Sequence, residues 1–262
     1  MSHIVKTEAV VLKSMKYRES SKIVTLYTRK FGKISVIVKG ARLPKSKYGS
    51  ALEPMSYVAI VLYKKDGREI QTLSQADSVR SFLSLREDLQ KMAVGMTVIE
   101  LVNIVAHEQE ENASLFNLLV ESLTTVNDST KNPSNVFYRF EVYLSRILGF
   151  QLTFDKCVSC RKKLSDGEPD GNAVQFHLAK GGPLCTKCGN VAGQKVSLSR
   201  NSFKALQQIS TLNDPSDALE ITIEHTFKRE MESLLDNYLR YHVSGFRALK
   251  SGKVFSKILN VP

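Results

Sequence analysis

The sequence predicts a multidomain α+β protein in which an N-terminal β-barrel is followed by an all-α domain with an inserted four-cysteine zinc module. Three observations predict this. Residues 1–80 carry short β-rich runs separated by turns, apolar residues recur at helical spacing from residue 81 onward, and all four cysteines fall in one paired pattern. We therefore expect a barrel at 1–80, helical parts at 81–156 and 196–262, and a zinc module at 157–195.

Five strands are expected in the first part of the chain. Gly32 marks one hairpin turn, and Asp66-Gly67 is a turn dipeptide that commonly joins antiparallel strands. Because no helix of any length interrupts these runs, they predict a small barrel of the OB or SH3-like type. The expected strands are 4–13, 22–28, 33–39, 56–63 and 69–75.

The positive charge of the chain is concentrated in the same part. The net charge is +11, and residues 1–80 hold 16 Lys/Arg against 6 Asp/Glu. A solvated face would mix lysine with glutamate, whereas a concentrated excess of one sign indicates a surface for a polyanion. The loop from Lys39 to Gly49 has four cations and no acid, and its Gly40 and Pro44 argue against a helix.

Aromatic residues are interleaved with these cations. OB-folds hold single strands by combining a basic groove with stacking platforms. About half of the aromatics are expected to fill the barrel interior. We expect Tyr17, Phe31 and Tyr48 to be exposed, because each lies in or beside a turn that carries cations.

The remainder of the chain outside the cysteine region has a helical period. Pro133 suits the first turn of a helix, and Gly149 suits a position just beyond its end. The apolar stripes of these segments are typical of a core. The expected helices are 81–107, 114–126, 133–148, 201–212 and 221–243.

The cysteines form two C-x-x-C pairs, and these predict a structural Zn²⁺ site. Two thiolates on each tight turn can close a tetrahedral site of four sulfurs, which leaves no open position for a substrate. Two disulfides are the main alternative, and His177 could replace one ligand. A catalytic zinc of the deaminase type requires an H-x-E motif, which is absent at His107. The expected ligands are Cys157, Cys160, Cys185 and Cys188.

Motifs of catalysis and of membrane insertion are absent from the sequence. There is no dinucleotide-binding glycine motif, Walker A loop, H-E-x-x-H motif or nucleophile elbow. We therefore expect a protein that is not an enzyme. The chain begins without an apolar signal segment and has no apolar run that could span a bilayer, so we expect a cytoplasmic location, where free thiols favour metal over disulfides.

The order of these parts, together with several local strings, resembles the RecO family of bacterial recombination mediators and DNA-repair proteins. The resemblance extends from about residue 3 to residue 255. It depends on many weak motifs in the right order rather than on one sharp motif. The strings that carry it are residues 17–28, 31–34, 39–42, 45–46, 148–150 and 181–184, together with Phe176 and the two cysteine pairs.

The resemblance implies an OB-fold, structural zinc and a nucleoid-associated protein that binds single- and double-stranded DNA. It also implies annealing of complementary strands and contact with the acidic tail of the single-stranded-DNA-binding protein. With RecR, such a protein helps to load RecA onto coated single strands. The candidate DNA-binding residues are Arg18, Lys22, Arg29, Lys30, Lys33, Lys39, Arg42, Lys45 and Lys47.

Two other classes of protein share some of these features. A zinc-ribbon adaptor that binds structured RNA would have a basic barrel and zinc, but it would not anneal DNA. A zinc hydrolase or deaminase would require an open coordination position, which four cysteine ligands would fill.

Overall fold

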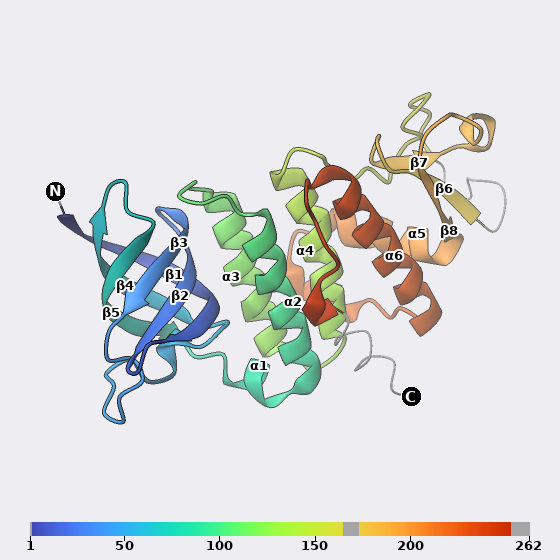
Figure 1. Ribbon diagram of the computed structural model, residues 1–262. Coiled ribbons are helices and arrows are strands. Elements are labelled where there is room, and N and C mark those ends of the chain that lie inside the picture. Colours follow the sequence, from blue (N-terminus) through green and yellow to red (C-terminus); the bar gives the residue numbers. More distant parts are fainter. Residues whose placement is uncertain (1, 165–172, 253–262) are drawn as a thin grey trace. The chain divides into compact units, whose positions relative to one another are not determined.

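The computed structural model describes residues 2–164 and 173–252, and these residues form two compact units (Figure 1). The first unit contains the described residues up to Asp128 together with those from Leu249 onward. The second unit extends from Ser129 to Ala248. The chain thus leaves the first unit after Asp128 and returns to it at Leu249.

Five strands of the first unit form a closed barrel in the order β1-β2-β3-β5-β4. The first part of β1 pairs with β4 and the later part pairs with β2, both in antiparallel orientation. A parallel pairing of β3 with β5 closes the barrel. The strands are β1 (Ser2–Tyr17), β2 (Ser21–Thr28), β3 (Gly32–Val38), β4 (Tyr57–Lys65) and β5 (Ile70–Arg80).

All five expected strands are therefore confirmed, although β1 and β5 are longer than expected. The run Val10-Val11-Leu12 is buried at all three positions, which obscured the alternation of β1. The pairing of β1 with β2 shifts register between Val11 and Lys13. Such a bulge bends a strand and increases its twist, and it lets β1 continue around the barrel.

Alternate residues of the strands fill the barrel interior with aliphatic side chains. Burial of each such side chain contributes roughly 1.5–3 kcal/mol to stability. Tyr48 and Leu52 pack into the same core from the segment before β4, where Leu52 belongs to the 3₁₀ helix η1 (Gly49–Leu52). The core residues from the strands are Ala9, Val11, Val24, Leu26, Ile34, Val36, Val38, Val58, Ile60, Leu62, Leu73 and Ala76.

Three helices complete the first unit, namely α1 (Leu83–Glu87), α2 (Leu89–Val105) and α3 (Ala113–Asp128). The single helix expected at 81–107 is wrong, because Asp88 has extended dihedral angles and separates α1 from α2. The carboxylate of Asp88 accepts a hydrogen bond from the backbone N–H of Lys91 at 2.9 Å. Residues that cap a helix in this way adopt non-helical dihedral angles.

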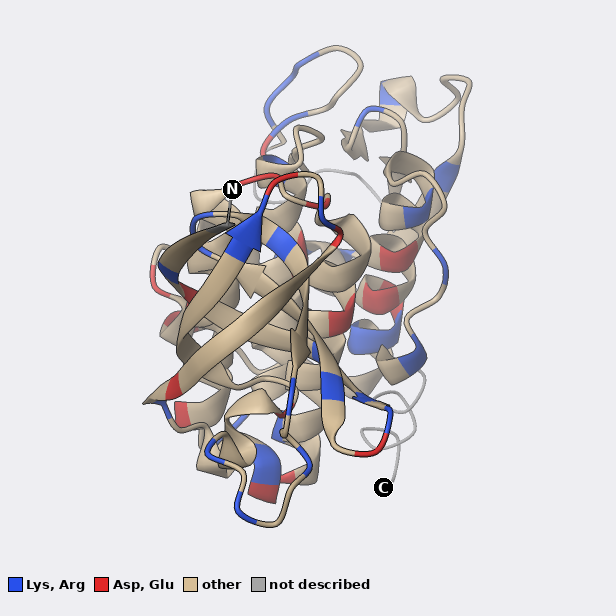
Figure 2. Cartoon of the chain, turned by 60° about the vertical axis from the view of Figure 1, so that its left-hand side comes forward, with Lys and Arg blue, Asp and Glu red and all other residues tan. Residues whose placement is uncertain are grey.

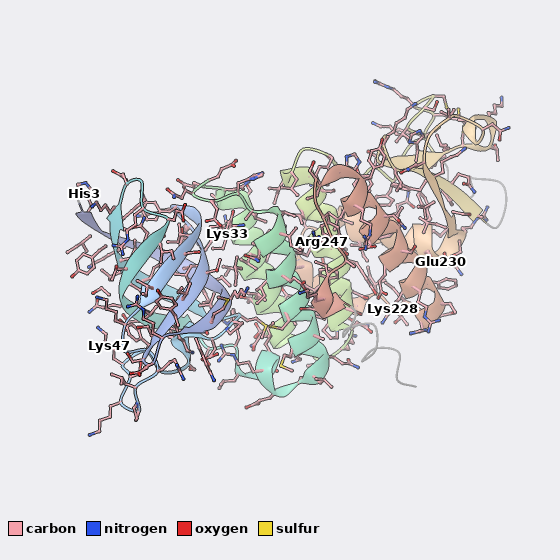
Figure 3. The ribbon with its side chains drawn as sticks, in the orientation of Figure 1. His3, Lys33, Lys47, Lys228, Glu230 and Arg247 are labelled. Atoms are coloured by element: carbon pink, nitrogen blue, oxygen red, sulfur yellow. The ribbon has the colours of Figure 1, made fainter. Side chains whose placement is uncertain are left out.

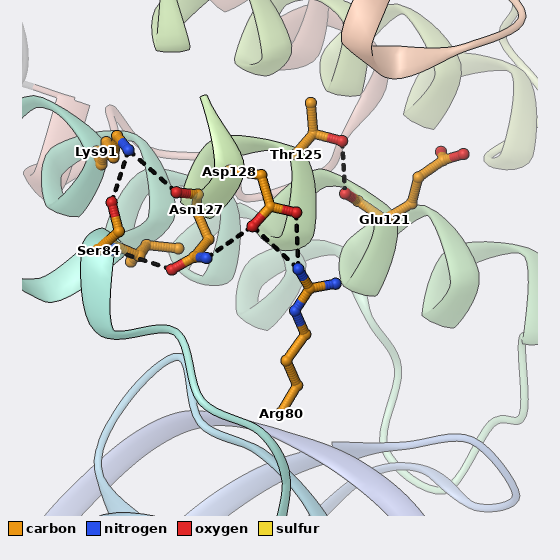
Figure 4. A network of polar contacts seen from close by, with 8 residues as sticks. Arg80, Ser84, Lys91, Glu121, Thr125, Asn127 and Asp128 are labelled. Atoms are coloured by element: carbon orange, nitrogen blue, oxygen red, sulfur yellow. Dashed lines mark hydrogen bonds and ion pairs between the residues drawn. The ribbon is translucent and has the colours of Figure 1, made fainter. Parts of the chain in front are cut away.

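Polar contacts join the barrel to these helices within the first unit. At the end of β5, both oxygens of Asp128 accept hydrogen bonds from the Arg80 guanidinium, at 2.9 and 2.7 Å (Figure 4). Next to this ion pair, the side chain of Lys91 in α2 donates to the Asn127 carbonyl oxygen in α3 at 3.0 Å and joins the two helices. The barrel and α1–α3 thus form one packed body.

The second unit is built on α4 (Pro133–Ile147), α5 (Arg200–Thr211) and α6 (His225–His242). Pro133 lies in the first turn of α4 as expected, and Gly149 beyond its end has φ +86°. The expected start of α6 at 221 is wrong, because residues 221–224 are extended after the 3₁₀ helix η3 (Pro215–Glu220). None of the described helices has the length and hydropathy required to cross a bilayer.

A small three-stranded sheet, which the sequence analysis did not predict, carries the cysteine region. Its order is β7-β6-β8, and both pairings are antiparallel. The strands are β6 (Ala173–His177), β7 (Gly182–Leu184) and β8 (Lys195–Ser199). Strands of three to five residues are too short for a clear alternation of apolar residues.

Candidate nucleic-acid interface and metal centre

The nine candidate cations lie in two groups at opposite ends of β2. The register of β1 with β2 places Tyr17 opposite Ser21, and that of β2 with β3 places Thr28 opposite Gly32, so the two connecting turns are a full strand apart. One group surrounds the β1–β2 hairpin and contains Arg18, Lys22, Lys39, Arg42, Lys45 and Lys47. The other surrounds the β2–β3 turn and contains Arg29, Lys30 and Lys33.

Hydrogen bonds hold the basic loop 39–48 against the β1–β2 hairpin. The Arg42 guanidinium donates to the Arg18 carbonyl oxygen at 2.9 Å, and the Arg42 backbone N–H donates to the Ser20 carbonyl oxygen at 3.0 Å. The Arg18 guanidinium lies 5.3 Å from the centre of the Tyr17 ring. Two segments that are far apart in the sequence therefore present their cations on one surface.

Five members of this first group are exposed, and one is not. Lys22 retains 17% side-chain exposure, and its Nζ lies 2.7 Å from a carboxylate oxygen of Glu53. Lys22 is thus an ion-pair partner within the fold. The exposed members, which we call the hairpin-loop cluster, are Arg18, Lys39, Arg42, Lys45 and Lys47.

The expected exposure of Tyr48 is wrong. Its side chain is 7% exposed and packs in the barrel core, and its hydroxyl donates to the Ser74 carbonyl oxygen at 3.1 Å. Lys47 donates to the same carbonyl oxygen at 2.8 Å and lies 5.3 Å from the Tyr48 ring. Burial raises the pKa of the Tyr48 hydroxyl above its ordinary value. Tyr48 therefore positions the loop and is not available for base stacking, whereas Tyr17 and Phe31 are half-buried.

Arg29 connects the barrel to the helices. It donates to a carboxylate oxygen of Glu8 at 2.7 Å and to Asn117 Oδ1 at 2.8 Å, and it lies 4.6 Å from the Phe116 ring centre. The hydrogen bond from Arg29 holds the pKa of the Glu8 carboxyl below its ordinary value. These partners leave Arg29 little freedom to follow a phosphate backbone.

Lys33, like Arg29, connects the barrel to the helices, whereas Lys30 does not. The Lys33 side chain is 13% exposed, and its Nζ donates to the Asn103 carbonyl oxygen of α2 at 3.0 Å. Lys30 is exposed in the β2–β3 turn. Lys33 lies on the side of the barrel toward the helices, whereas Lys47 lies away from them (Figure 3).

Basic residues occur on several loops and strand ends of the barrel, with few acidic residues among them (Figure 2). The hairpin-loop cluster is the part in which exposed cations from two segments are joined by hydrogen bonds. A shallow pocket of about 640 Å³ lies beside it, lined by Tyr17, Arg18, Glu19, Ser20, Ser21, Ile37 and Lys39.

An apolar row next to this pocket was not predicted from the sequence. Met15 of β1 lies opposite Ile23 of β2, and Ile23 lies opposite Ile37 of β3. All three side chains are partly or largely exposed. The alternation of residues 13–17, 21–25 and 35–39 could have placed these side chains on the outer face.

The four cysteine sulfurs of the second unit lie within 4.8 Å of one another. The Sγ atoms of Cys160 and Cys185 are 3.7 Å apart, which is too far for a disulfide. Tetrahedral Zn²⁺ with Zn–S bonds of about 2.3 Å separates its sulfurs by about 3.8 Å. The thiols thus have the donor set of a tetrahedral zinc site and a spacing that is compatible with one.

Each cysteine pair is held on its own tight turn. In the first, the Arg161 N–H donates to the Cys157 carbonyl oxygen at 2.8 Å, and Arg161 has φ +64°. In the second, the Cys188 N–H donates to the Cys185 carbonyl oxygen at 2.9 Å within the short 3₁₀ helix η2 (Thr186–Cys188). The Val158 N–H donates to the Pro183 carbonyl oxygen at 3.0 Å and joins the first turn to β7, which leads into the second.

The thiols of this cluster shift one another's pKa values in opposite directions, and the hydrogen bond with the Cys185 side chain, together with burial, raises the pKa of Cys188 to about 12. Burial opposes ionisation of Cys157, but hydrogen bonds from the backbone N–H groups of Cys160, Cys185 and Ser159 outweigh it and lower the pKa of that thiol to about 6. Thiolates are the form that binds metal. Four thiolates around Zn²⁺ would carry a net charge of −2, and the exposed residues close to the cysteines in the sequence include four cations, namely Arg161, Lys162, Lys163 and Lys187.

His177 does not belong to the sulfur cluster. Its Nε2 is hydrogen-bonded to the Ala192 carbonyl oxygen at 3.0 Å, and its Nδ1 accepts from the Lys180 N–H at 3.4 Å. Both ring nitrogens are occupied within the sheet, so His177 has a structural role. Among the described residues, the four cysteines are the only group with metal-binding geometry.

Comparison with known proteins agrees with this arrangement. The family model described as "Recombination protein O N terminal" matches residues 1–82, and "Recombination protein O C terminal" matches residues 86–252. Three similar proteins are each named DNA repair protein RecO. That of Chloroherpeton thalassium is 35% identical over 97% of this chain and 98% of its own length. That of Salinibacter ruber is 34% identical, covering 97% and 94%, and that of Chlorobium limicola is 32% identical, covering 92% and 93%. The chain belongs to the RecO family of DNA-repair proteins.

Proposed function

We propose that this protein is a DNA-binding recombination mediator without catalytic activity. In this proposal it binds single- and double-stranded DNA at the nucleoid, anneals complementary strands and, with RecR, helps to load RecA onto single strands coated by the single-stranded-DNA-binding protein. Membership of the RecO family supports the role in DNA repair. We further propose that the five-stranded barrel is an OB-fold, a Greek-key barrel that commonly binds oligonucleotides.

The observation that carries the proposal is the hairpin-loop cluster. Its five exposed cations lie on two segments joined by the hydrogen bonds of Arg42 to Arg18 and Ser20. Contacts from lysine and arginine to phosphates are independent of sequence, and they leave base edges free to pair. Annealing requires this combination, because two negatively charged backbones must be neutralised while their bases meet.

The other four candidate cations have less support as DNA ligands. Lys22, Arg29 and Lys33 are engaged with Glu53, Glu8 and Asn103. Lys30 is exposed but lies at the other end of β2, so it would contact a different stretch of the nucleic acid. We therefore propose that the hairpin-loop cluster is the principal phosphate-binding surface.

We propose that the cysteine cluster holds structural Zn²⁺. Four protein thiolates fill a tetrahedral site, so the metal would have no position for water or substrate. Zinc would supply folding free energy to the second unit, because the ligands are brought together from two turns that only the folded state joins.

The test is an annealing assay with two complementary labelled single strands, either bare or coated with the cognate single-stranded-DNA-binding protein. Acceleration of both reactions is expected. Failure to accelerate either, with retained binding to structured RNA, would overturn the proposal in favour of an RNA-binding adaptor.

A further inference from the structure

A row of aliphatic side chains crosses the outer face of the barrel beside the hairpin-loop cluster. Cross-strand pairing aligns Met15 with Ile23 and Ile23 with Ile37. The neighbouring Val24, Val36 and Val38 point into the core, so the three members of the row point outward. Met15 retains 45% exposure, and the two isoleucines are partly exposed. We call these three residues the apolar row.

Polar and cationic residues border the apolar row on both sides. On one side, Tyr17 lies opposite Ser21, and Lys39 directly follows β3. On the other side, Lys13 lies opposite Thr25, which lies opposite Ser35. Lys13 is exposed on the same face of β1 as Met15, and the exposed Arg18 lies in the adjoining hairpin turn. An apolar strip with positive borders matches a ligand that has apolar faces and a negatively charged backbone.

The bases of a single strand have that chemistry. Unpaired bases present flat apolar faces, and their phosphates can reach flanking cations. In a duplex the same faces are hidden within the stack, so a protein meets phosphates and base edges but not base faces. Charge complementarity therefore favours an anionic ligand over a neutral or basic protein segment, and single-stranded nucleic acid carries one negative charge for each exposed base.

Two of the three aromatic residues expected to stack on bases are not placed for contact with unpaired bases on this face. Tyr48 is buried in the core, and Phe31 packs partly against that core with Lys64 5.7 Å from its ring centre. Tyr17 alone among the three expected stacking residues lies beside the row, where it lines the pocket with Ile37 and Lys39.

We propose that the apolar row is a base-contacting site for single-stranded nucleic acid, with Tyr17 stacking on a base at one end. This inference rests on the proposed function and assigns different parts of the nucleic acid to two neighbouring surfaces. The hairpin-loop cluster binds phosphates of single strands and duplexes alike, whereas the apolar row binds unpaired bases. Contacts to bases release no counterions, so they add affinity for single strands without changing the salt dependence.

The test compares a triple variant, Met15→Ser, Ile23→Thr and Ile37→Thr, with the wild-type protein. Threonine retains the branched Cβ that suits a strand. The matched control is Ile4→Thr, Tyr63→Thr and Val79→Thr, three exposed apolar residues on other parts of the same barrel. Binding to a mixed-sequence single strand, to the corresponding duplex and to an abasic single strand is measured over a range of salt concentrations.

We expect the apolar-row variant to bind single strands about tenfold more weakly or worse. Its duplex affinity should stay within about twofold of wild type and its salt slope should be unchanged, and the control should match wild type throughout. The wild-type protein should bind the abasic strand more weakly than the normal strand, and this difference should be smaller in the variant, which retains Tyr17.

Unchanged single-strand affinity in the variant would overturn the inference, as would equal wild-type affinity for normal and abasic strands. Retained single-strand affinity together with lost annealing on coated strands alone would assign the row to a protein contact instead. Failure of the proposed function gives a different result, because the wild-type protein would then neither bind DNA nor accelerate annealing.

Discussion

The guanidinium of Arg42 donates a hydrogen bond to the backbone carbonyl oxygen of Arg18 at 2.9 Å. The two residues belong to different segments of the barrel, and this bond holds the basic loop against the β1–β2 hairpin. Its consequence is a single cationic surface built from two segments. Because phosphate contacts depend on cations held in position, the proposed DNA binding by the hairpin-loop cluster depends on this hydrogen bond.

Reversing the charge of Lys39, Arg42 and Lys45 together should weaken binding to every DNA sequence tested. The slope of log affinity against log salt should become shallower by roughly 2–3, because three phosphate contacts are lost. Reversal of Lys180, Lys204 and Arg247 changes the net charge by the same amount at exposed positions of the second unit, and it serves as the control. An equal loss in both variants would show that total charge, and not the hairpin-loop cluster, governs binding.

Replacing Arg29 by alanine should affect stability more than DNA binding. The substitution removes hydrogen bonds to Glu8 and Asn117 and the contact with Phe116, and we expect a loss of about 1–2 kcal/mol in the free energy of unfolding. Urea denaturation measures the loss, and the salt slope of DNA binding should remain unchanged. A shallower slope with unchanged stability would return Arg29 to the DNA-binding surface.

Lys33 and Lys39 show what the sequence could and could not predict about the cations. Both lie at the ends of the same predicted strand, and the positive charge of each makes it a candidate DNA-binding residue. The contact that separates them joins Lys33 to Asn103, 70 residues away, and depends on the packing of α2 against the barrel. Such long-range contacts are absent from local patterns, so the exposed and engaged cations could not be distinguished.

Gly32→Ala should destabilise the protein much more than Gly67→Ala. Both glycines have positive φ, at +58° and +73°, so each substitution carries a similar backbone strain of about 1 kcal/mol. A Cβ at Gly32 would lie 1.9 Å from the Glu110 carbonyl oxygen, whereas nothing lies within 4 Å of one at Gly67. Thermal unfolding of the two variants measures the difference. Equal melting temperatures would mean that the segment around Glu110 does not pack against the barrel.

Glu141→Gln should raise stability at alkaline pH and have little effect at acidic pH. Glu141 is 5% exposed, and its burial, together with the negative charges of Glu232 and Asp236, raises the pKa of its carboxyl well above the ordinary value of 4.5. A carboxyl whose pKa is higher in the folded state favours folding fully below its unfolded pKa, and this contribution is lost as pH rises toward the folded value.

The advantage of Glu141→Gln over wild type should therefore grow above pH 4.5, by at most about 1.4 kcal/mol per pH unit. Urea denaturation at pH 4.5 and pH 8 measures it, with Glu111→Gln, at an exposed position, as the control. A difference that is the same at both pH values would contradict the burial of a neutral carboxyl at this position.

Cys157→Ser or Cys185→Ser should release zinc and lower the melting temperature of the second unit, because the site contributes folding free energy. Metal analysis and thermal unfolding measure the two effects. Thr186→Ala, an exposed change between two ligands, should retain both properties. Wild-type metal content and melting in both cysteine variants would refute a structural zinc.

The cysteine site was largely predictable because its signal is local. Two C-x-x-C pairs specify two tight turns, and the observed cluster contains the four expected residues. The supporting sheet was not predictable, since β7 has three residues and its pairing with β6 depends on the fold around it. Similarly, the local pattern places Asp88 at a polar position inside one long helix. The boundary between α1 and α2 follows only from the hydrogen bond that Asp88 accepts from Lys91.

The proposal that the hairpin-loop cluster binds the DNA backbones is tested most directly by the rate at which two complementary strands anneal. Three proteins are compared: the wild type, the variant with the charges of Lys39, Arg42 and Lys45 reversed, and the control with the charges of Lys180, Lys204 and Arg247 reversed. Each is measured on bare and on coated strands, followed by fluorescence. We predict that the wild-type protein and the second-unit control accelerate annealing on both substrates and that the hairpin-loop reversal does not. Annealing by the hairpin-loop reversal at the wild-type rate would contradict the claim that this surface binds the DNA backbones.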